Sequence, residues 1–226
     1  MLHSDGMLGP DWGGENLVVI KETRLSRKPA RGSLTVAGVS VTLLFLSSLV
    51  YWTDTLGLAG FLSANREAVF VRGEYWRLGT SIGAHADLGH LLANALPFGV
   101  LSFLLYGYYG ALVYPALVLL LGTLVTALAV STYPAHISLL GASGVVYLMA
   151  AVWLTLYLLV DRRVGLRKRI VRAVGFCLIV LVPTTVEPTV SYRAHAIGFG
   201  LGVAAALVCF SRWRDSFRSE ERIELE

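Results

Sequence analysis

The chain has 226 residues, of which 55% are apolar and 15% are charged. In soluble domains about a quarter of the residues are charged, so this composition excludes an ordinary soluble domain. The net charge is +4, but the basic residues gather at the ends of apolar runs, where they act as topology signals, and we expect no nucleic-acid partner. Cys177 and Cys209 lie in apolar runs without CxxC spacing, which favours neither a disulfide scaffold nor a zinc site.

The N-terminal half begins with a soluble stretch. Residues 1–33 hold acidic residues, glycines and five basic residues without a continuous apolar core, which predicts a tail rather than a signal peptide. The first membrane span is expected over residues 34–52 and ends at Trp52, an aromatic typical of membrane interfaces. A long connector over 53–86 carries Trp76 and Arg77 and has enough apolar residues to fold back onto the bilayer.

Five further apolar runs predict an all-α polytopic bundle of six transmembrane helices. The second span begins near Asp87, a plausible N-cap, and the fifth is short and contains Pro183. The membrane domain is expected over residues 34–211, followed by a charged tail over 212–226. The five ranges are 87–106, 111–130, 137–160, 173–186 and 194–210.

The distribution of basic residues predicts the orientation of the bundle. The N-terminal segment, the loop after the fourth span and the C-terminal tail together hold 15 of the 19 lysines and arginines (5, 6 and 4). The positive-inside rule therefore places both termini in the cytoplasm. We expect a prokaryotic cell membrane, since no transit-like segment is visible.

A few polar residues interrupt the predicted spans. Because hydrocarbon penalises unpaired polar groups, these residues are the informative ones. They fall in the first turns of spans two, four and six, which all begin on the outer side, so we expect one polar site in the outer half of the bilayer. The residues are His90, Asn94, Ser143, Tyr147 and His195.

Ser143 lies between glycines in the segment Gly141-Ala142-Ser143-Gly144. A serine at a helix start has free backbone N–H groups nearby, and these favour a developing anion. His195 can accept the serine proton, and Tyr147, one turn after Ser143, can pack against the imidazole. Alternatively, a serine between glycines serves helix packing, and Tyr147 is an ordinary packing aromatic.

The remaining polar and small residues have both a catalytic and a structural interpretation. His90 and Asn94 share one helix face and can form an oxyanion hole, or they can hydrogen-bond across helices to stabilise the bundle. Gly198 and Gly202 have the GxxxG spacing of closely packed helices, which could hold His195 near Ser143. There is no HExxH sequence and no membrane-embedded aspartate pair, so we expect neither a metal nor another cofactor.

Together these residues resemble the rhomboid family of intramembrane serine proteases. The resemblance covers residues 34–211 and rests on joint order and spacing. The matching residues are Trp76-Arg77, His85, His90-x-x-x-Asn94, Gly141-x-Ser143-Gly144-x-x-Tyr147 and Ala194-His195-x-x-Gly198-x-x-x-Gly202.

The resemblance implies a serine endopeptidase that cleaves single-span membrane proteins within or near their membrane segment. Ser143 is then the nucleophile and His195 the base, with His90, Asn94 and the Ser143 backbone as oxyanion stabilisers. It also implies that His85 helps order the site and its water, that the first loop is a partly membrane-embedded structural element carrying Trp76 and Arg77, and that substrates enter laterally near spans two and five. Alternatively, His85 is an exposed loop histidine, and Trp76 and Arg77 are an interfacial anchor pair. The main alternative is an inactive rhomboid-like protein that binds membrane clients; a small transporter or scaffold is a third.

Overall fold

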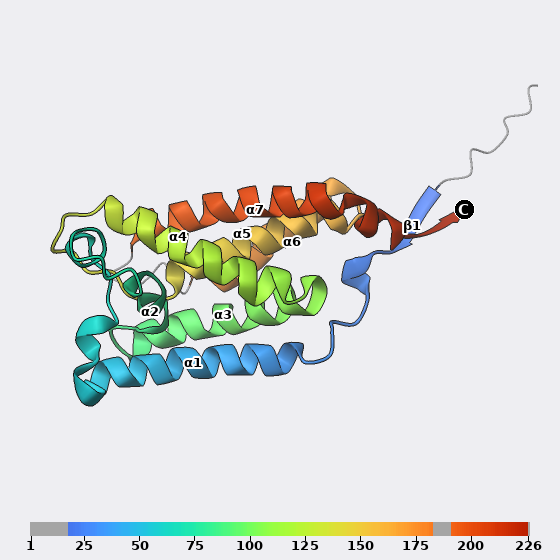
Figure 1. Ribbon diagram of the computed structural model, residues 1–226. Coiled ribbons are helices and arrows are strands. Elements are labelled where there is room, and N and C mark those ends of the chain that lie inside the picture. Colours follow the sequence, from blue (N-terminus) through green and yellow to red (C-terminus); the bar gives the residue numbers. More distant parts are fainter. Residues whose placement is uncertain (1–17, 183–190, 226) are drawn as a thin grey trace, which may run out of the picture.

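A computed structural model describes residues 18–182 and 191–225. The long helices of this part of the chain run along a common direction, and both β1 and β2 lie at the same end of the bundle (Figure 1). The predicted all-α polytopic fold is confirmed. The helices are α1 (Ser33–Thr53), α3 (Leu88–Tyr109), α4 (Val118–Ser131), α5 (Ser143–Val160), α6 (Leu166–Leu181) and α7 (Tyr192–Ser219).

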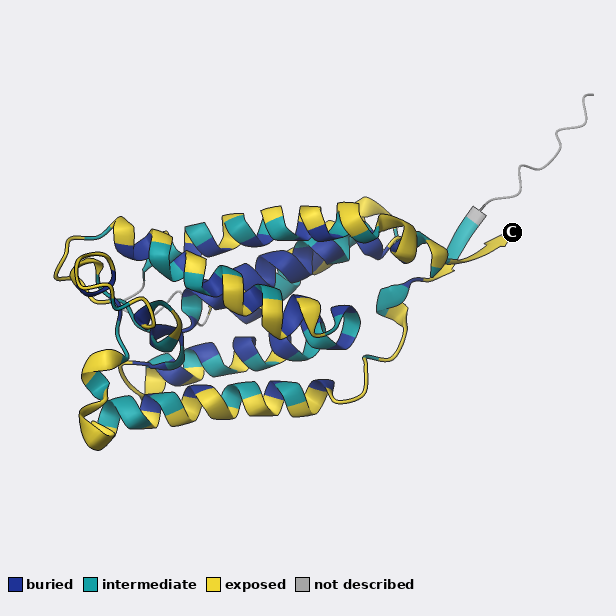
Figure 2. Ribbon diagram, in the orientation of Figure 1, coloured by how far each residue is buried: buried dark blue, intermediate teal, exposed yellow. Residues whose placement is uncertain are grey.

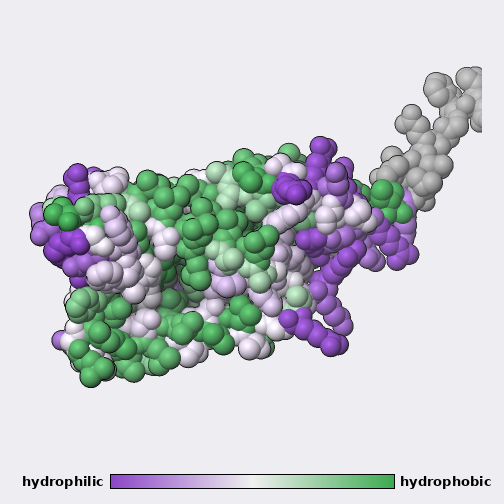
Figure 3. All heavy atoms as spheres, in the orientation of Figure 1, coloured by the Kyte–Doolittle hydropathy of each residue, from purple (hydrophilic) through white to green (hydrophobic). Residues whose placement is uncertain are grey.

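Five of these segments are long and apolar enough to cross a membrane, with mean hydropathies between 1.7 and 2.2. They include α4 together with the helical turn before it, over Leu112–Ser131. The sixth, α6, has 16 residues, which corresponds to a length of about 24 Å. Apolar side chains cover the flank of the bundle, and hydrophilic ones gather at its ends (Figure 3), as expected of an integral membrane protein.

Helix α5 forms the centre of the bundle. Twelve of its 18 residues are buried, and it is the most continuously buried helix in Figure 2. Its neighbours are α3, α4, α6 and α7, whereas α1 packs mainly against α3 at the edge. A helix that is apolar on all sides belongs in such a position, because no face of it needs to meet water or headgroups.

The fourth predicted span starts later than expected. Residues 137–142 are not helical, and Leu139 exchanges two backbone hydrogen bonds with Ala64, of 2.9 and 2.7 Å. Gly141 has φ +112°, which a right-handed helix cannot contain. This segment is apolar because it is partly covered by the first loop, and α5 therefore begins at Ser143 itself.

The fifth and sixth predicted spans also differ in their bounds. Helix α6 begins at Leu166 rather than at residue 173, because arginine and lysine are good helix formers and extend it outward. Pro183 and the end of that predicted span lie outside the described residues. Helix α7 continues to Ser219, beyond the predicted residue 210, through a distorted position at Trp213.

The two terminal segments meet in a small sheet that was not expected from the sequence. Strand β1 (Val18–Glu22) pairs antiparallel with β2 (Arg222–Leu225). Next to the strands, Arg24 forms an ion pair with Glu220 and lies 4.6 Å over the Phe217 ring. Because Phe217 belongs to the apolar core, Arg24 connects the strand pair to the bundle. Residues 1–17 of the predicted tail lie outside the described chain.

Candidate active site

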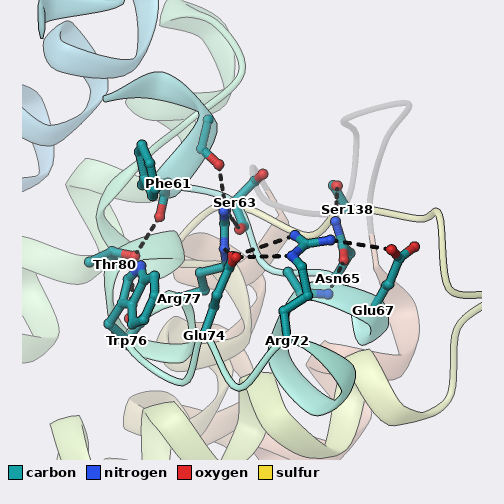
Figure 4. A network of polar contacts seen from close by, with 12 residues as sticks. Phe61, Ser63, Asn65, Glu67, Arg72, Glu74, Trp76, Arg77, Thr80 and Ser138 are labelled. Atoms are coloured by element: carbon teal, nitrogen blue, oxygen red, sulfur yellow. Dashed lines mark hydrogen bonds and ion pairs between the residues drawn. The ribbon is translucent and has the colours of Figure 1, made fainter. Parts of the chain in front are cut away.

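The connector between α1 and α3 folds into a compact loop of short helical turns. These are Thr55–Gly57, Ala59–Phe61 and Glu67–Val71, followed by α2 (Arg77–Gly83). Arg77 is buried in the loop, donates to the carbonyls of Gly60 and Ser63, and pairs with Glu74 (Figure 4). Hydrogen bonds from Arg72 and Arg77 hold the pKa of Glu74 below its usual value. Trp76, by contrast, is exposed, as an interface anchor should be.

This loop supports the segment that leads to Ser143. Ala64 follows the Ser63 carbonyl that Arg77 binds, and its backbone pairs with Leu139. The Asn65 side chain donates to the Ser138 hydroxyl at 3.3 Å (Figure 4), and the Gly141 N–H donates to the Ser81 carbonyl at 2.8 Å. The first loop is thus connected by hydrogen bonds to the residues that precede the predicted nucleophile.

Ser143 is the first residue of α5, and Ala142 is its N-cap. The backbone N–H groups at residues 143–145 have no acceptor four residues earlier within the helix, because they form its first turn. The positive end of the helix dipole is therefore at Ser143. It is an environment in which a developing oxyanion is stabilised.

His85 lies directly behind this helix start and is fully buried. Its Nε2 accepts a hydrogen bond from the Ala142 N–H at 3.3 Å, so Nδ1 carries the proton of the neutral ring and faces the Ser48 hydroxyl at 3.0 Å. Burial, with a contribution from His90, lowers the pKa of His85 to about 3. His85 is therefore neutral at pH 7, and it holds Ala142 in place. Trp52 donates to its carbonyl at 2.8 Å.

His90 is placed against the backbone beside Ser143. Asp87 caps α3 by accepting from the His90 N–H at 2.8 Å. The His90 ring packs so closely on Gly141 that a Cβ there would lie 2.7 Å from the ring carbon Cε1. Gly141 is therefore required both for its φ and for the space that the imidazole occupies. Asn94, one turn further, is buried and donates to the His90 carbonyl at 2.9 Å.

His195 lies in the first turn of α7, which Ser191 caps by accepting from the Ala194 N–H. The start of α7 is fixed to the end of α4: Ser191 hydrogen-bonds the Tyr133 hydroxyl at 3.0 Å, and Arg193 lies 4.8 Å over the Tyr133 ring. Arg193 also donates to a carbonyl at the end of α4. The imidazole of His195 is thereby fixed at the α5–α7 interface.

The His195 ring stacks on Tyr147, with centroids 4.0 Å apart and an interplanar angle of 13°. Its Nε2 is buried and has no hydrogen-bond partner among the described residues. Tyr147 is four residues after Ser143, on the same face of α5. The stacking therefore places the imidazole on the side of α5 that carries Ser143.

Two glycines allow the close approach of α7 to α5. A Cβ at Gly198 would overlap the Gly144 carbonyl, and one at Gly202 would overlap the Leu148 carbonyl. A Cβ at Gly144 would meet Ala194 at 3.4 Å, so small residues face each other on both helices. The predicted GxxxG packing is seen here in atomic contacts.

A cavity of about 230 Å³ lies in front of Ser143. Its lining includes Ser143, His90, Ala194 and Gly141, together with the hydroxyl-bearing residues Ser81, Thr126, Ser138 and Ser191. Hydroxyl groups around a cavity in an apolar bundle can hydrogen-bond water. The cavity can therefore supply water to Ser143.

The predicted polar residues lie near the starts of α3, α5 and α7, and these helix starts lie at the end of the bundle opposite the two terminal strands (Figure 1). Two residues that contact the site were not predicted: Ser48, which faces Nδ1 of His85, and Ser81, whose carbonyl accepts from the Gly141 N–H. The only sign of a role for Ser48 in the sequence is its position as a polar residue inside the first predicted span. In the part of the chain that the structure describes, no group of three or more His, Cys, Asp or Glu residues could hold a metal ion.

The fold and this site define an integral membrane protein whose polar residues meet where three helices begin. The rhomboid domain family matches residues 72–212, more than half of the chain, and the chain therefore belongs to the rhomboid family. No curated protein matches the chain.

Proposed function

We propose that this rhomboid is an active intramembrane serine endopeptidase. The observation that carries the proposal is the position of Ser143 at a helix start, one turn before Tyr147, whose ring stacks on the His195 imidazole. Membership of a family made up largely of intramembrane serine proteases supports it. The substrates we propose are single-span membrane proteins, cleaved within or near the membrane segment.

In the proposed reaction the Ser143 hydroxyl attacks the scissile carbonyl, and His195 Nε2 takes the proton. The tetrahedral oxyanion is stabilised by the Ser143 N–H and by the side chains of His90 and Asn94. His195 then protonates the leaving amine, the C–N bond breaks, and an ester with Ser143 remains. Water, deprotonated by His195, hydrolyses this ester and restores the serine.

Two features of the site suit this chemistry. The buried Nε2 of His195 has no hydrogen-bond partner among the described residues, so it is available to a substrate-positioned serine. The cavity beside Ser143 has room for hydrolytic water in a bundle that otherwise excludes it. A substrate segment must present an extended backbone to this cavity, which helix-destabilising residues in the substrate would favour.

The location proposed for this reaction is the outer half of a prokaryotic cell membrane. The site lies at the bundle end opposite β1 and β2 (Figure 1). The N-terminal segment, the loop after the fourth predicted span and the C-terminal tail together hold 15 of the 19 lysines and arginines. By the positive-inside rule both termini are then cytoplasmic. Lateral access near α3 and α6 is part of the proposal.

The test is cleavage of a single-span protein by the purified chain in vesicles of phospholipid. We expect cleavage with the native chain and none with Ser143→Ala or His195→Ala. The alternative function, binding of membrane clients by an inactive rhomboid, predicts client capture that both substitutions leave intact. Undiminished cleavage by Ser143→Ala would exclude the proposed nucleophile.

A further inference from the structure

A second cavity lies at the opposite end of the bundle from Ser143. It has a volume of about 460 Å³ and is formed by the end of α5, the start of α6 and the C-terminal part of α7. Hydrophilic side chains gather over this end of α7 in Figure 3. We call it the basic crevice; its lining residues are Leu158, Leu159, Arg162, Leu166, Arg169, Phe210, Ser211, Arg214 and Arg218.

The crevice is positively charged. Four of its lining residues are arginines, and none of the described lining residues is acidic. Arg162 and Arg218 both pair with Glu221, at 3.3 and 2.6 Å, so one carboxylate is shared between two guanidinium groups. A net positive charge therefore remains in the crevice.

Arg169 has an unusual environment. One of its terminal nitrogens donates to the Leu158 carbonyl, but its Nε is buried without a hydrogen-bond partner in the described part of the chain. A buried guanidinium N–H without an acceptor is unfavourable, which indicates that an anionic acceptor belongs there.

The beginning of α6 adds to this preference for anions. Gly165 precedes the helix without a side-chain cap, and its first turn contains no acidic residue. The positive end of the α6 dipole is therefore not neutralised by the chain itself where it meets the crevice.

The walls of the crevice are apolar. Leu158, Leu159, Leu166 and Phe210 line it, and Leu207 and Val208 are exposed on the adjoining turn of α7. A crevice lined by both basic and apolar side chains matches a phospholipid, which carries a phosphate above its acyl chains. We propose that the basic crevice binds the phosphate headgroup of an anionic phospholipid, with Arg169 and Arg214 as its main contacts.

The test is native mass spectrometry of the purified full chain with added phosphatidylglycerol or phosphatidylcholine of equal chain length. We expect phosphatidylglycerol to be retained more strongly. The double substitution Arg169→Gln/Arg214→Gln should weaken its binding about 30-fold, because each arginine near an anionic headgroup contributes a factor of about five.

The matched control is Arg167→Gln/Lys168→Gln, which also removes two positive charges, both from the first turn of α6 and outside the basic crevice. This control should weaken phosphatidylglycerol binding less than about threefold, because its charges act on the headgroup only from a distance and are screened by salt. If the Arg169 variant does not fold, Arg214→Gln alone carries the test, with about a fivefold loss. Equal losses in test and control variants, equal retention of both lipids, or displacement by millimolar inorganic phosphate would overturn the proposal.

Discussion

The close packing of α7 on α5 leads to a sharp prediction for Gly198→Ala. The added Cβ would overlap the Gly144 carbonyl, a backbone atom that cannot rotate away. The two helices must separate, and overpacking of this kind destabilises a protein by about 1–3 kcal/mol. Because His195 is three residues before Gly198, the same separation moves the imidazole away from Ser143. A displacement of about 1 Å in a catalytic group can lower the rate about 100-fold.

The assay compares thermal unfolding in detergent and cleavage in vesicles for Gly198→Ala and Gly200→Ala. Gly200 is exposed on the same helix, and a Cβ there meets nothing within 4 Å. Its substitution should leave cleavage unchanged and raise helix stability by up to about 1 kcal/mol. If Gly198→Ala unfolds and cleaves like Gly200→Ala, the account of this interface is wrong.

Three further predictions concern residues around the site. Replacing the buried Arg77 by Gln should lower the free energy of unfolding by about 2–3 kcal/mol, because two carbonyls and a carboxylate lose their hydrogen-bond donor. In the same denaturation experiment, the control Arg66→Gln on the exposed surface of the loop should change this free energy by less than about 0.5 kcal/mol. The unfolded chain takes up a proton at His85 below about pH 6.5 but the folded chain only near pH 3, so His85 should lower stability by up to roughly 1.4 kcal/mol for each unit by which the pH falls between these values. His85→Asn should make the pH dependence of a series of unfolding curves shallower by this amount. Cleavage rates should survive Tyr147→Phe, which keeps the ring under His195, and fall at least about tenfold in Tyr147→Ala; similar rates for both variants would argue against a positioning role.

The sequence was sufficient to predict the bundle because length and hydropathy determine which segments can lie in a bilayer. It also predicted that polar residues of three spans lie at one end, since alternating spans begin on the same side. It did not predict that residues 137–142 are non-helical. Leu139 is apolar and pairs with Ala64 of the first loop, and a periodic pattern cannot distinguish that environment from lipid.

The support behind the site was equally hard to predict. Arg77 binds backbone carbonyls, which every residue carries, so no side-chain pattern marks its partners. The role of His85 depends on the Ala142 N–H and on Ser48, which are 57 and 37 residues away in the chain. The strand pair at the termini likewise joins segments from the two ends of the sequence, and neither segment alone indicates a sheet.

The central claim is that Ser143 is an activated nucleophile with His195 as its base. The most direct measurement is labelling of the detergent-purified chain with a fluorophosphonate probe, which reacts with activated serines. We predict that the native chain is labelled and that folded Ser143→Ala and His195→Ala are not. A folded native chain that stays unlabelled, or labelling that persists in Ser143→Ala, would contradict the account.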